Sequence, residues 1–378
     1  MSMPKITINL VVLNGERYIR HCLEAILAQT YPHEFIEINI LDNNSIDDTR
    51  PIIKNCELKI KNSNFAAFGL VESQQNLGMW PGQEELLKYT NSKYIIALCV
   101  DVLMDKDFVK NAVEVMEKNE KIGALQPKIC GFELGIMNNE SGGENHYSLF
   151  TIHYSRVIDT CGFKIFRSRR VVNIGHGLSS AEASASKGFN FDKQQEIFAV
   201  EGAVSVFRKE ALESCRIKIR NSKFEIRNSE IADSDFVWYG DDLDLAWRMR
   251  LFGWKEVFAP NVIAWHDRQT TKTLKKNWFD YLSRVSGRRQ IPTKKRRLDW
   301  RNTRWTLVKN DYIINILKDL PWIILRETAV LGYTVLFERD VLKEIPIFFR
   351  YLPKMLRKRR EIMRRAITKP QEIKKWIN

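Results

Sequence analysis

Up to residue 126, the chain alternates between short, almost wholly apolar runs and longer segments with helical periodicity. The apolar runs include residues 6–13, 36–41 and 94–100, and their length and composition are typical of strands covered on both faces. Residues 16–29 and 105–118 place apolar side chains at helical spacing. This alternation predicts an α/β fold with a Rossmann-like, mostly parallel sheet flanked by helices.

Polar residues follow the ends of the predicted strands. Asn14 comes after the first strand and Asp42 after the second. Asn76 follows a weaker strand near residues 70–72, and Asp101 follows the run that ends at Val100. Because the carboxyl ends of parallel strands share one edge of the sheet, where α/β proteins bind ligands, we expect these polar side chains to converge on one crevice.

A second informative stretch is residues 236–266, FVWYGDDLDLAWRMRLFGWKEVFAPNVIAWH. Three aspartates within 241–244 crowd the start of a predicted helix, and an apolar return segment ends at His266. Carboxylates in a first helical turn also complement the helix dipole, by roughly 0.3–1 kcal/mol each, and a single His is usually structural. Gly240 permits a close approach to a ligand, and three acids exceed the need of one helix end, which favours a functional site.

Four ordered motifs over residues 5–267 resemble family 2 inverting glycosyltransferases of the GT-A fold. The run YGDDLDLAWRMRLFGWKEVFAP, with the later His, resembles their C-terminal signature, in particular that of the rhamnosyltransferase-like branch. The segment VVLNGERYIRHCLEAILAQTYP resembles their first strand and helix. ILDNNSIDDT resembles the motif whose leading aspartate reads the nucleotide base, and QQNLGMWPGQEELL resembles the loop beside the diphosphate.

The resemblance implies an enzyme of cell-envelope polysaccharide synthesis. It would move rhamnose or another hexose from a nucleoside diphosphate sugar, of the UDP or dTDP type, to a glycan or lipid-linked acceptor. The acceptor hydroxyl needs a base to take its proton, and the family pattern gives this role to Asp242, with Asp241 as the nearest competitor. The nucleotide-sugar-binding residues that the resemblance implies are Leu13, Asn14, Asp42, Asn44, Asn76, Gly78, Asp101 and Gly202.

The resemblance also implies a divalent cation, Mg²⁺ or Mn²⁺, held by Asp101 and His266. Asp101 occupies the position of the family's Asp-x-Asp motif, but the triplet here is Cys99-Val100-Asp101, so the first acid is missing. Hard cations prefer oxygen ligands and keep several waters, so the diphosphate would complete the site and binding without nucleotide should be weak. The alternative that Asp101 only caps the following helix stays open.

Charge is distributed unevenly along the chain. Residues 268–378 contain 29 Lys and Arg against 10 Asp and Glu, whereas residues 1–267 contain 31 against 36. We therefore predict a GT-A domain in 1–267, followed by a basic helical region that associates with an anionic membrane surface or with a second subunit. Within 341–363, an apolar stripe opposite Lys354 and Lys358 is typical of a helix that lies among lipid headgroups.

We expect a cytoplasmic protein that is peripherally associated with the inner face of the cell membrane. The N-terminal sequence enters a strand-like run without signal-peptide features, and the six cysteines show no paired or metal-binding spacing. Residues 321–337 are strongly apolar but include two charged residues, whereas a spanning helix needs about 20 apolar residues.

Two classes of function stay open on the sequence alone. One is the membrane-associated glycosyltransferase, and the other is a nucleic-acid-binding protein that uses the basic C-terminal region. The acidic cluster at 241–244 would repel a polyanion, and the chain has no nucleic-acid motif, so we expect no nucleic-acid partner. A nucleotidyltransferase is disfavoured because no Gly-rich loop with a basic end follows Leu13.

Overall fold

The computed structural model describes residues 3–136, 150–186, 188–220, 226–268, 288 and 291–378. Its main sheet consists of β1 (Ile6–Val12), β2 (Ile36–Asp42), β3 (Ala67–Glu72), β4 (Tyr94–Cys99), β5 (Val102–Met104), β6 (Ile122–Ile136), β7 (Phe150–Thr160), β10 (Gln195–Glu196), β11 (Val204–Arg208) and β14 (Lys255–His266). Two small antiparallel sheets pair β8 (Phe163–Ile165) with β9 (Val171–Asn173), and β12 (Ile217–Arg220) with β13 (Ile226–Glu230).

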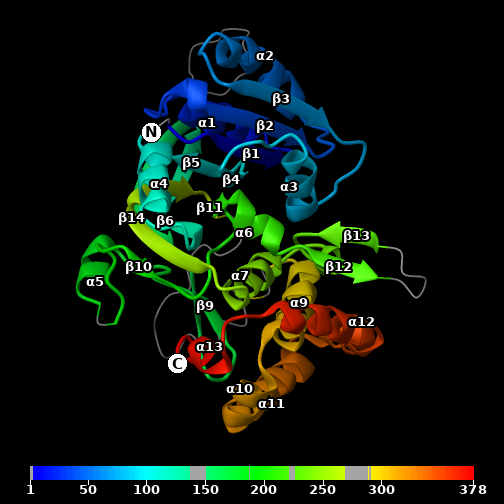
Figure 1. Ribbon diagram of the computed structural model, residues 1–378. Helices are drawn as coiled ribbons and strands as arrows, with labels where there is room; N and C mark the ends of the chain where they lie inside the picture. The colour runs from blue at the N-terminus through cyan, green and yellow to red at the C-terminus, as the bar shows by residue number, and fades with distance from the viewer. Residues whose placement is uncertain (1–2, 137–149, 187, 221–225, 269–287, 289–290) are drawn as a thin grey trace.

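The order of the main sheet is β10-β14-β6-β11-β4-β1-β2-β3, with β5 beside β14 and β7 beside β6 (Figure 1). The pairs β1–β2, β1–β4 and β2–β3 are parallel, which confirms the predicted mostly parallel sheet. All seven residues of β1 are buried, as its unbroken apolar run predicted. The chain leaves β1 towards β2 on one side and later returns to β4 on the other, so the switch point lies beside β1.

Helices cover both faces of the sheet. They are α1 (Glu16–Leu27), α2 (Thr49–Lys61), α3 (Met79–Leu87), α4 (Phe108–Glu117), α5 (Ser180–Ser184), α6 (Lys209–Ser214) and α7 (Asp241–Leu251), with 3₁₀ turns η1 (His33–Phe35) and η2 (Ser234–Phe236). Helix α3 begins at Met79, directly after Gly78. Pro81 lies in the first turn of α3, where a proline costs little because its missing N–H would have no partner within the helix.

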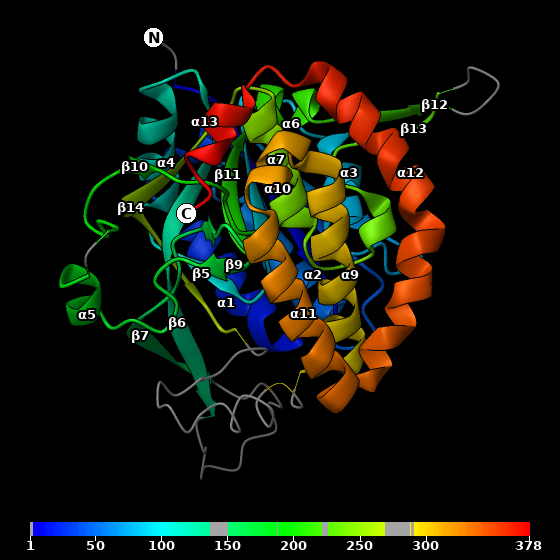
Figure 2. The same ribbon diagram turned by 90° about the horizontal axis from the view of Figure 1, so that it is seen from below.

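The C-terminal region forms α9 (Thr293–Asn310), α10 (Ile313–Lys318), α11 (Leu320–Phe337), η3 (Arg339–Lys343), α12 (Glu344–Arg365) and α13 (Pro370–Lys374). Helix α9 packs against α7 and α12 (Figures 1 and 2). The end of the chain returns to the body, where Ile377 bridges to Ile165 and the N–H of Arg167 donates to the carbonyl oxygen of Asn378 at 2.7 Å. The region is therefore tied to the body by α9 and by its last residues.

The inner side of α12 differs from the prediction. Lys354 and Lys358 were expected among lipid headgroups, but both point at acids that precede α7. Lys354 Nζ lies 2.6 Å from Asp235 Oδ1, while Lys358 Nζ lies 2.8 Å from Asp235 Oδ2 and also binds the buried Asp233. The prediction for these two lysines was wrong because helical spacing shows which residues share a face but not what that face meets.

Candidate functional site

The loops that follow β1, β2 and β3 are hydrogen-bonded to one another at the carboxyl edge of the sheet. The N–H of Asn14 donates to Ser45 Oγ at 2.9 Å, and the N–H of Ile46 donates to Asn14 Oδ1 at 3.0 Å. The side-chain amide of Asn43 donates to Asn76 Oδ1 at 3.0 Å. The structure thus brings Asn14 and Asn76 to one edge, as the strand order predicted.

Three other residues predicted to bind the nucleotide sugar lie on the same loops. Leu13 is 40% exposed, and Asn44 is exposed with a left-handed φ of 71°. Gly78 has a φ of 92°, and a Cβ there would lie 3.2 Å from the carbonyl oxygen of Val237. A side chain at position 78 would therefore crowd the segment that leads into α7, which brings the predicted nucleotide loop beside the second half of the site.

Asp42 is the one predicted nucleotide contact whose carboxylate is fully buried. It accepts a hydrogen bond from the N–H of Ser45 at 3.2 Å and pairs with the guanidinium of Arg50. A carboxylate has about four lone-pair sites, so Asp42 can fix its own loop and still accept one more donor. In this structure its visible role is to hold the loop.

Asp101 and His266 meet because β5 pairs antiparallel with β14, which sets Val102 opposite His266. His266 Nε2 lies 3.4 Å from Asp101 Oδ2, and the two side chains are 11% and 31% exposed. Burial lowers the pKa of His266, but Asp101 and Asp159 outweigh this effect and raise it to about 10. Without a metal ion the imidazole is therefore cationic between two carboxylates.

The sequence interpretation missed a chain of buried charges behind His266. Nδ1 of His266 donates to Asp159 Oδ2 at 2.9 Å, and Arg268 Nε lies 2.7 Å from Asp159 Oδ1. Arg268 Nη2 then donates to Glu201 Oε1 at 2.7 Å. Burial raises the pKa of Asp159, but hydrogen bonds from His176 and His266 outweigh it and lower that pKa. No local motif marks Asp159 or Arg268, since the contacts arise only from the pairing of distant strands.

Asp241 and Asp242 open α7 immediately after Gly240, whose φ is 79°. Asp242 Oδ1 accepts the N–H of Leu243 at 2.7 Å, and Oδ2 accepts the N–H of Gly202 at 3.3 Å. Burial raises the pKa of both aspartates, and the pKa of Asp242 is raised further by the negative charge of Asp241. A raised pKa makes a carboxylate a stronger proton acceptor once it is ionised.

Gly202 joins the two halves of the site. A Cβ at this position would lie 3.2 Å from the Cβ of Asp242. The segment that precedes β11 can therefore approach the start of α7 this closely because residue 202 has no side chain. The carbonyl of Gly202 lies 3.9 Å from the sulfur of Cys99, two residues before Asp101. The start of α7 and the end of β4 therefore both contact Gly202.

Cys99 occupies the place of the missing first acid. Burial, followed by the negative charges of Asp101 and Glu201, raises the pKa of this thiol. The thiol is therefore neutral, and a neutral thiol is a poor metal ligand.

The residues present fit a cation that arrives with a nucleotide. Among the described residues, no group of three or more His, Cys, Asp or Glu side chains is arranged to hold a metal ion. Asp101 and His266 offer one oxygen and one nitrogen 3.4 Å apart, and ligand distances of roughly 2.0–2.2 Å would allow both to reach one ion. The remaining positions would fall to diphosphate oxygens and water.

Helix α9 holds the segment that precedes the acids. The side-chain amide of Asn302 donates to the carbonyl oxygens of Phe236 at 2.9 Å, Trp238 at 2.8 Å and Tyr239 at 2.7 Å. Val237 and Tyr239 have left-handed φ values of 64° and 71°, which cost of order 1–3 kcal/mol each for residues other than glycine. A buried amide from the C-terminal region thus stabilises a strained turn that sets the start of α7.

The third acid of the run has a structural role. Asp244 Oδ2 lies 3.1 Å from Arg248 Nη2, and Asp244 Oδ1 lies 2.8 Å from Lys309 Nζ and 2.7 Å from the amide of Asn310. All four side chains are buried. Arg248, one helical turn after Asp244, is thus engaged in a buried structural pair.

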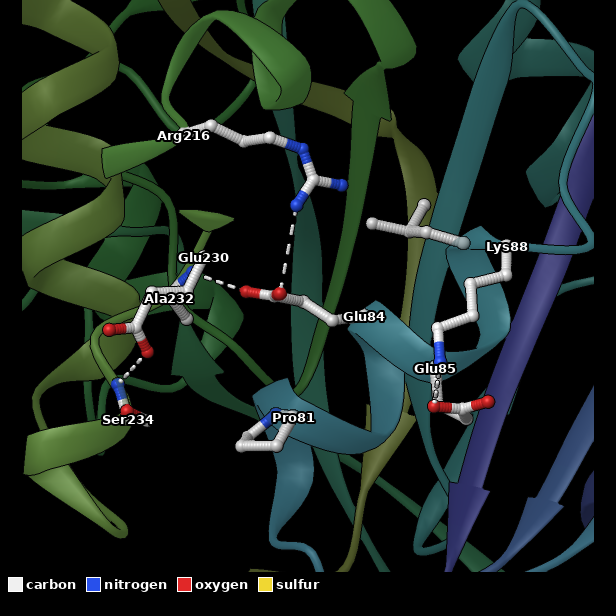
Figure 3. A pocket seen from close by; sticks show the side chains of 9 residues that line it. Pro81, Glu84, Glu85, Lys88, Arg216, Glu230, Ala232 and Ser234 are labelled. Atoms are coloured by element: carbon white, nitrogen blue, oxygen red, sulfur yellow. Dashed lines mark hydrogen bonds and ion pairs between the residues drawn. The ribbon is translucent and has the colours of Figure 1, made fainter. Parts of the chain in front are cut away.

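A separate pocket of about 350 Å³ lies beside α3 and contains none of the predicted site residues (Figure 3). It is lined by Pro81, Glu84, Glu85, Leu87, Lys88, Arg216, Glu230, Ala232 and Ser234. Glu84 accepts the N–H of Ala232 at 2.9 Å and lies 3.8 Å from Arg216. These contacts fasten α3 to the segment before η2, so the pocket lies where these two parts of the chain pack against each other.

The sheet order, the helical layers and the loops at the carboxyl edge define a GT-A-like α/β protein. Residues 7–174 match the model of the family described as Glycosyl transferase family 2, which is a little under half of the chain.

A curated protein from Methanococcus voltae, "Dolichyl N-acetyl-alpha-D-glucosaminyl phosphate 3-beta-D-2,3-diacetamido-2,3-dideoxy-beta-D-glucuronosyltransferase", is 31% identical over 139 residues. The match spans 37% of this chain and 41% of that protein. The chain therefore spans about two fifths of the length of its curated relative. Together with the family match, this likeness supports a glycosyltransferase.

Solved structures show a similar fold. One, "GalNAc-T7 with UDP, GalNAc and Mn2+", has a TM-score of 0.50 at 12% identity and covers 82% of this chain and 50% of that one. Another is "Mannosyltransferase PcManGT from Pyrobaculum calidifontis in complex with GDP-Man and Mn2+", with a TM-score of 0.45 at 15% identity, covering 96% and 86% of the two chains. At 12% identity, the likeness to the first of these structures concerns the fold alone.

Proposed function

We propose that this chain is an inverting glycosyltransferase that uses a nucleoside diphosphate sugar and a divalent cation. The observation that carries the proposal is the meeting of the two halves of the chain at Gly202, which contacts Asp242 on one side and Cys99, two residues before Asp101, on the other. The family match over residues 7–174 and the relative named as a glucuronosyltransferase support the same class of reaction.

In the proposed reaction, an acceptor hydroxyl attacks the anomeric carbon while the bond from that carbon to the diphosphate oxygen breaks. The bonding electrons leave with the diphosphate, and the hydroxyl proton passes to a carboxylate of Asp242. When bound, a cation held by Asp101 and His266 would offset the charge that develops on the diphosphate. The N–H of Gly202 holds Oδ2 of Asp242 and so fixes the direction of the accepting carboxylate.

We propose UDP or dTDP as the donor nucleotide and a hexose, with rhamnose as the first candidate, as the transferred sugar. The support for rhamnose is the resemblance of residues 236–266 to the rhamnosyltransferase-like branch. For the acceptor we propose a lipid-linked glycan, because the relative from Methanococcus voltae is named for a dolichyl phosphate-linked sugar.

The other function considered, nucleic-acid binding by the basic C-terminal region, loses part of its physical basis. Lys309 and Lys358 are buried in ion pairs with Asp233, and Arg169 of the body is buried against Asp311 and Asp319 of the same region. These charges stabilise contacts within the protein and are not presented to a polyanion.

The first test compares Asp242→Asn with Asp241→Asn in the full chain. Thermal-shift screening with nucleotide sugars and Mn²⁺ identifies the donor, and turnover is then measured with it. We expect Asp242→Asn to keep donor binding and to lose turnover by about 10²–10⁴-fold, with a smaller loss for Asp241→Asn. Because the base must be ionised and its pKa is raised, wild-type turnover should rise with pH above the range of an ordinary carboxyl group.

Two results would contradict this proposal in different ways. Normal turnover in Asp242→Asn would move the base to another residue. A full chain that no nucleotide sugar stabilises, with or without Mn²⁺, would remove the proposed donor class altogether.

A further inference from the structure

Helices α10 and α11 lie at the end of the molecule opposite α2 (Figure 1), and their exposed large apolar side chains form an apolar surface. Among the described residues, Leu320–Phe337 is the one helix that by length and composition could cross a membrane, with a mean hydropathy of 1.3 and 6% of its residues buried. We call this surface the α10–α11 face. Its large apolar side chains are Ile313, Ile314, Leu317, Leu320, Trp322, Ile324, Leu325, Leu331, Val335, Leu336 and Phe337, each 39–68% exposed.

The charged residues of α11 are turned away from this face. Arg326 and Glu327 are the only two in the helix. Arg326 Nη1 donates to Glu327 Oε1 at 2.6 Å, and Arg304 Nε of α9 donates to Glu327 Oε2 at 3.0 Å. A helix at a water-exposed surface normally directs its charges outward and its apolar side chains inward. Helix α11 has the opposite arrangement, and exposed apolar patches of this size mark an interaction surface.

Both ends of α11 are fixed to the rest of the protein. At its start, the buried Asp319 lies 2.9 Å from Arg167 and 2.6 Å from Arg169. At its end, the buried Glu338 lies 3.3 Å from Arg296 of α9. Its 18 helical residues extend roughly 27 Å, less than the roughly 30 Å of a bilayer core. With both ends held on the same body, the helix is placed to lie along a surface and not to cross a membrane.

We propose that the α10–α11 face inserts into one leaflet of an anionic bilayer, with the axis of α11 in the plane of the membrane. Charge complementarity favours an anionic membrane over other occupants, because each end of α11 is flanked by an exposed basic side chain. Lys318 and Arg339, which flank α11, are exposed. Each basic residue near an anionic leaflet contributes about 1 kcal/mol, and the buried apolar face adds to this.

Helix α9 lies between the turn of the candidate active site and α11. Asn302 of α9 holds the turn before Asp241, while Arg304 of the same helix binds Glu327 of α11. Residues two positions apart in an α-helix are separated by about 200° around the axis, so these contacts leave from opposite sides of α9. The turn and α11 are therefore separated by about the diameter of one helix, roughly 10–12 Å. This spacing suits a lipid-linked acceptor, and this point rests on the proposed function. The docking of the α10–α11 face on a membrane does not depend on the proposed function.

The test is co-sedimentation of the full chain with vesicles of phosphatidylcholine alone or mixed with phosphatidylglycerol. The variant Leu325→Glu/Leu336→Glu changes two side chains of the face that are 66% and 68% exposed, and Leu58→Glu on α2, also 68% exposed, is the matched control. We expect the wild type and Leu58→Glu to bind the anionic vesicles and to stay bound at high salt. The double variant should need at least about tenfold more lipid, because it removes two apolar side chains from the inserted face and adds two negative charges.

Equal binding of the double variant and the wild type would overturn the proposal, as would complete release of the wild type at high salt. A wild-type dimer that the double variant dissociates, without vesicle binding by either, would assign the face to a second copy of the chain and also overturn it. Donor-induced thermal shifts of the double variant, compared with those of the wild type, show that it is folded. They also separate a failure of docking from a failure of the proposed function.

Discussion

At the residue scale, three neighbouring aspartates acquire different properties from their surroundings. Asp244 meets Arg248 and Lys309, so its charge is compensated inside the protein. Within the described part of the chain no cation is paired with Asp241 or Asp242, and burial raises the pKa of both. The same residue type thus serves as a structural anion at one position and as a candidate base two residues earlier. Within one helical turn, Asp244 therefore contributes to stability, while Asp242 is available for chemistry.

The metal prediction also belongs to single residues, and His266→Ala tests it. We expect the variant to need at least about tenfold more Mn²⁺ for half-maximal turnover, because loss of a donor or its support weakens metal sites by about 10–100-fold. His176→Ala is the matched control, since His176 also contacts Asp159 but only His266 faces Asp101. Its half-maximal Mn²⁺ concentration should stay near that of the wild type.

The metal assignment fails if chelation of divalent ions leaves wild-type turnover unchanged. It also fails if His266→Ala and His176→Ala shift the Mn²⁺ requirement equally. In the second case both histidines would act only by orienting Asp159.

At the element scale, α9 is part of the candidate site although it belongs to the basic C-terminal region. Asn302 is fully buried and satisfies three carbonyl oxygens of a turn with left-handed residues. Without that amide, buried carbonyls lose their donors and the turn is free to relax. The start of α7 would then shift, and Asp242 with it, while the nucleotide loops after β1 and β2 would stay in place.

Asn302→Ala should therefore reduce kcat by about tenfold or more and leave the KM for the donor nearly unchanged, because small misplacements of a base are costly. Asn315→Ala is the matched control. Asn315 is 1% exposed and donates to the carbonyl oxygen of Pro370 at 2.9 Å, in a contact between α10 and α13. Both variants should lose stability, but only Asn302→Ala should lose kcat. Equal kcat values in the two variants would show that Asn302 has no positioning role.

The sequence predicted elements better than it predicted contacts. Local periodicity sufficed for β1, β2 and β4, whose apolar residues are buried as expected. It could not orient α12, because the acids that receive Lys354 and Lys358 lie more than a hundred residues earlier. The Asp101–His266 pair was found only through a family resemblance. Asp159, which is 107 residues from His266, carried no signal, since the two residues meet only because β7 and β14 both pair with β6.

At the scale of the whole molecule, the chain is less modular than its charge distribution suggests. The sequence divides at residue 267 into a mildly acidic part and a basic part. In the structure, basic residues of the second part neutralise buried acids of the first. Lys309 lies between Asp233 and Asp244, and Lys358 shares Asp233. The uneven charge distribution predicted two separate parts. At these positions, however, the opposite charges of the two parts pair with each other and hold the parts together.

Lys309→Met tests whether the two parts unfold together. Removing one partner from a buried ion pair leaves uncompensated charge and typically costs about 3–5 kcal/mol, so we expect a loss of that order in urea unfolding. Lys318→Met is the matched control, because Lys318 is an exposed lysine of the same region, at the end of α10. Its substitution should change the free energy of unfolding by about 0.5 kcal/mol or less.

If body and C-terminal helices form one cooperative unit, fluorescence and far-UV circular dichroism should report a single transition for Lys309→Met, at a lower urea concentration than for the wild type. Two separated transitions, with the body unaffected, would show instead that residues 268–378 dock on a domain that is stable without them.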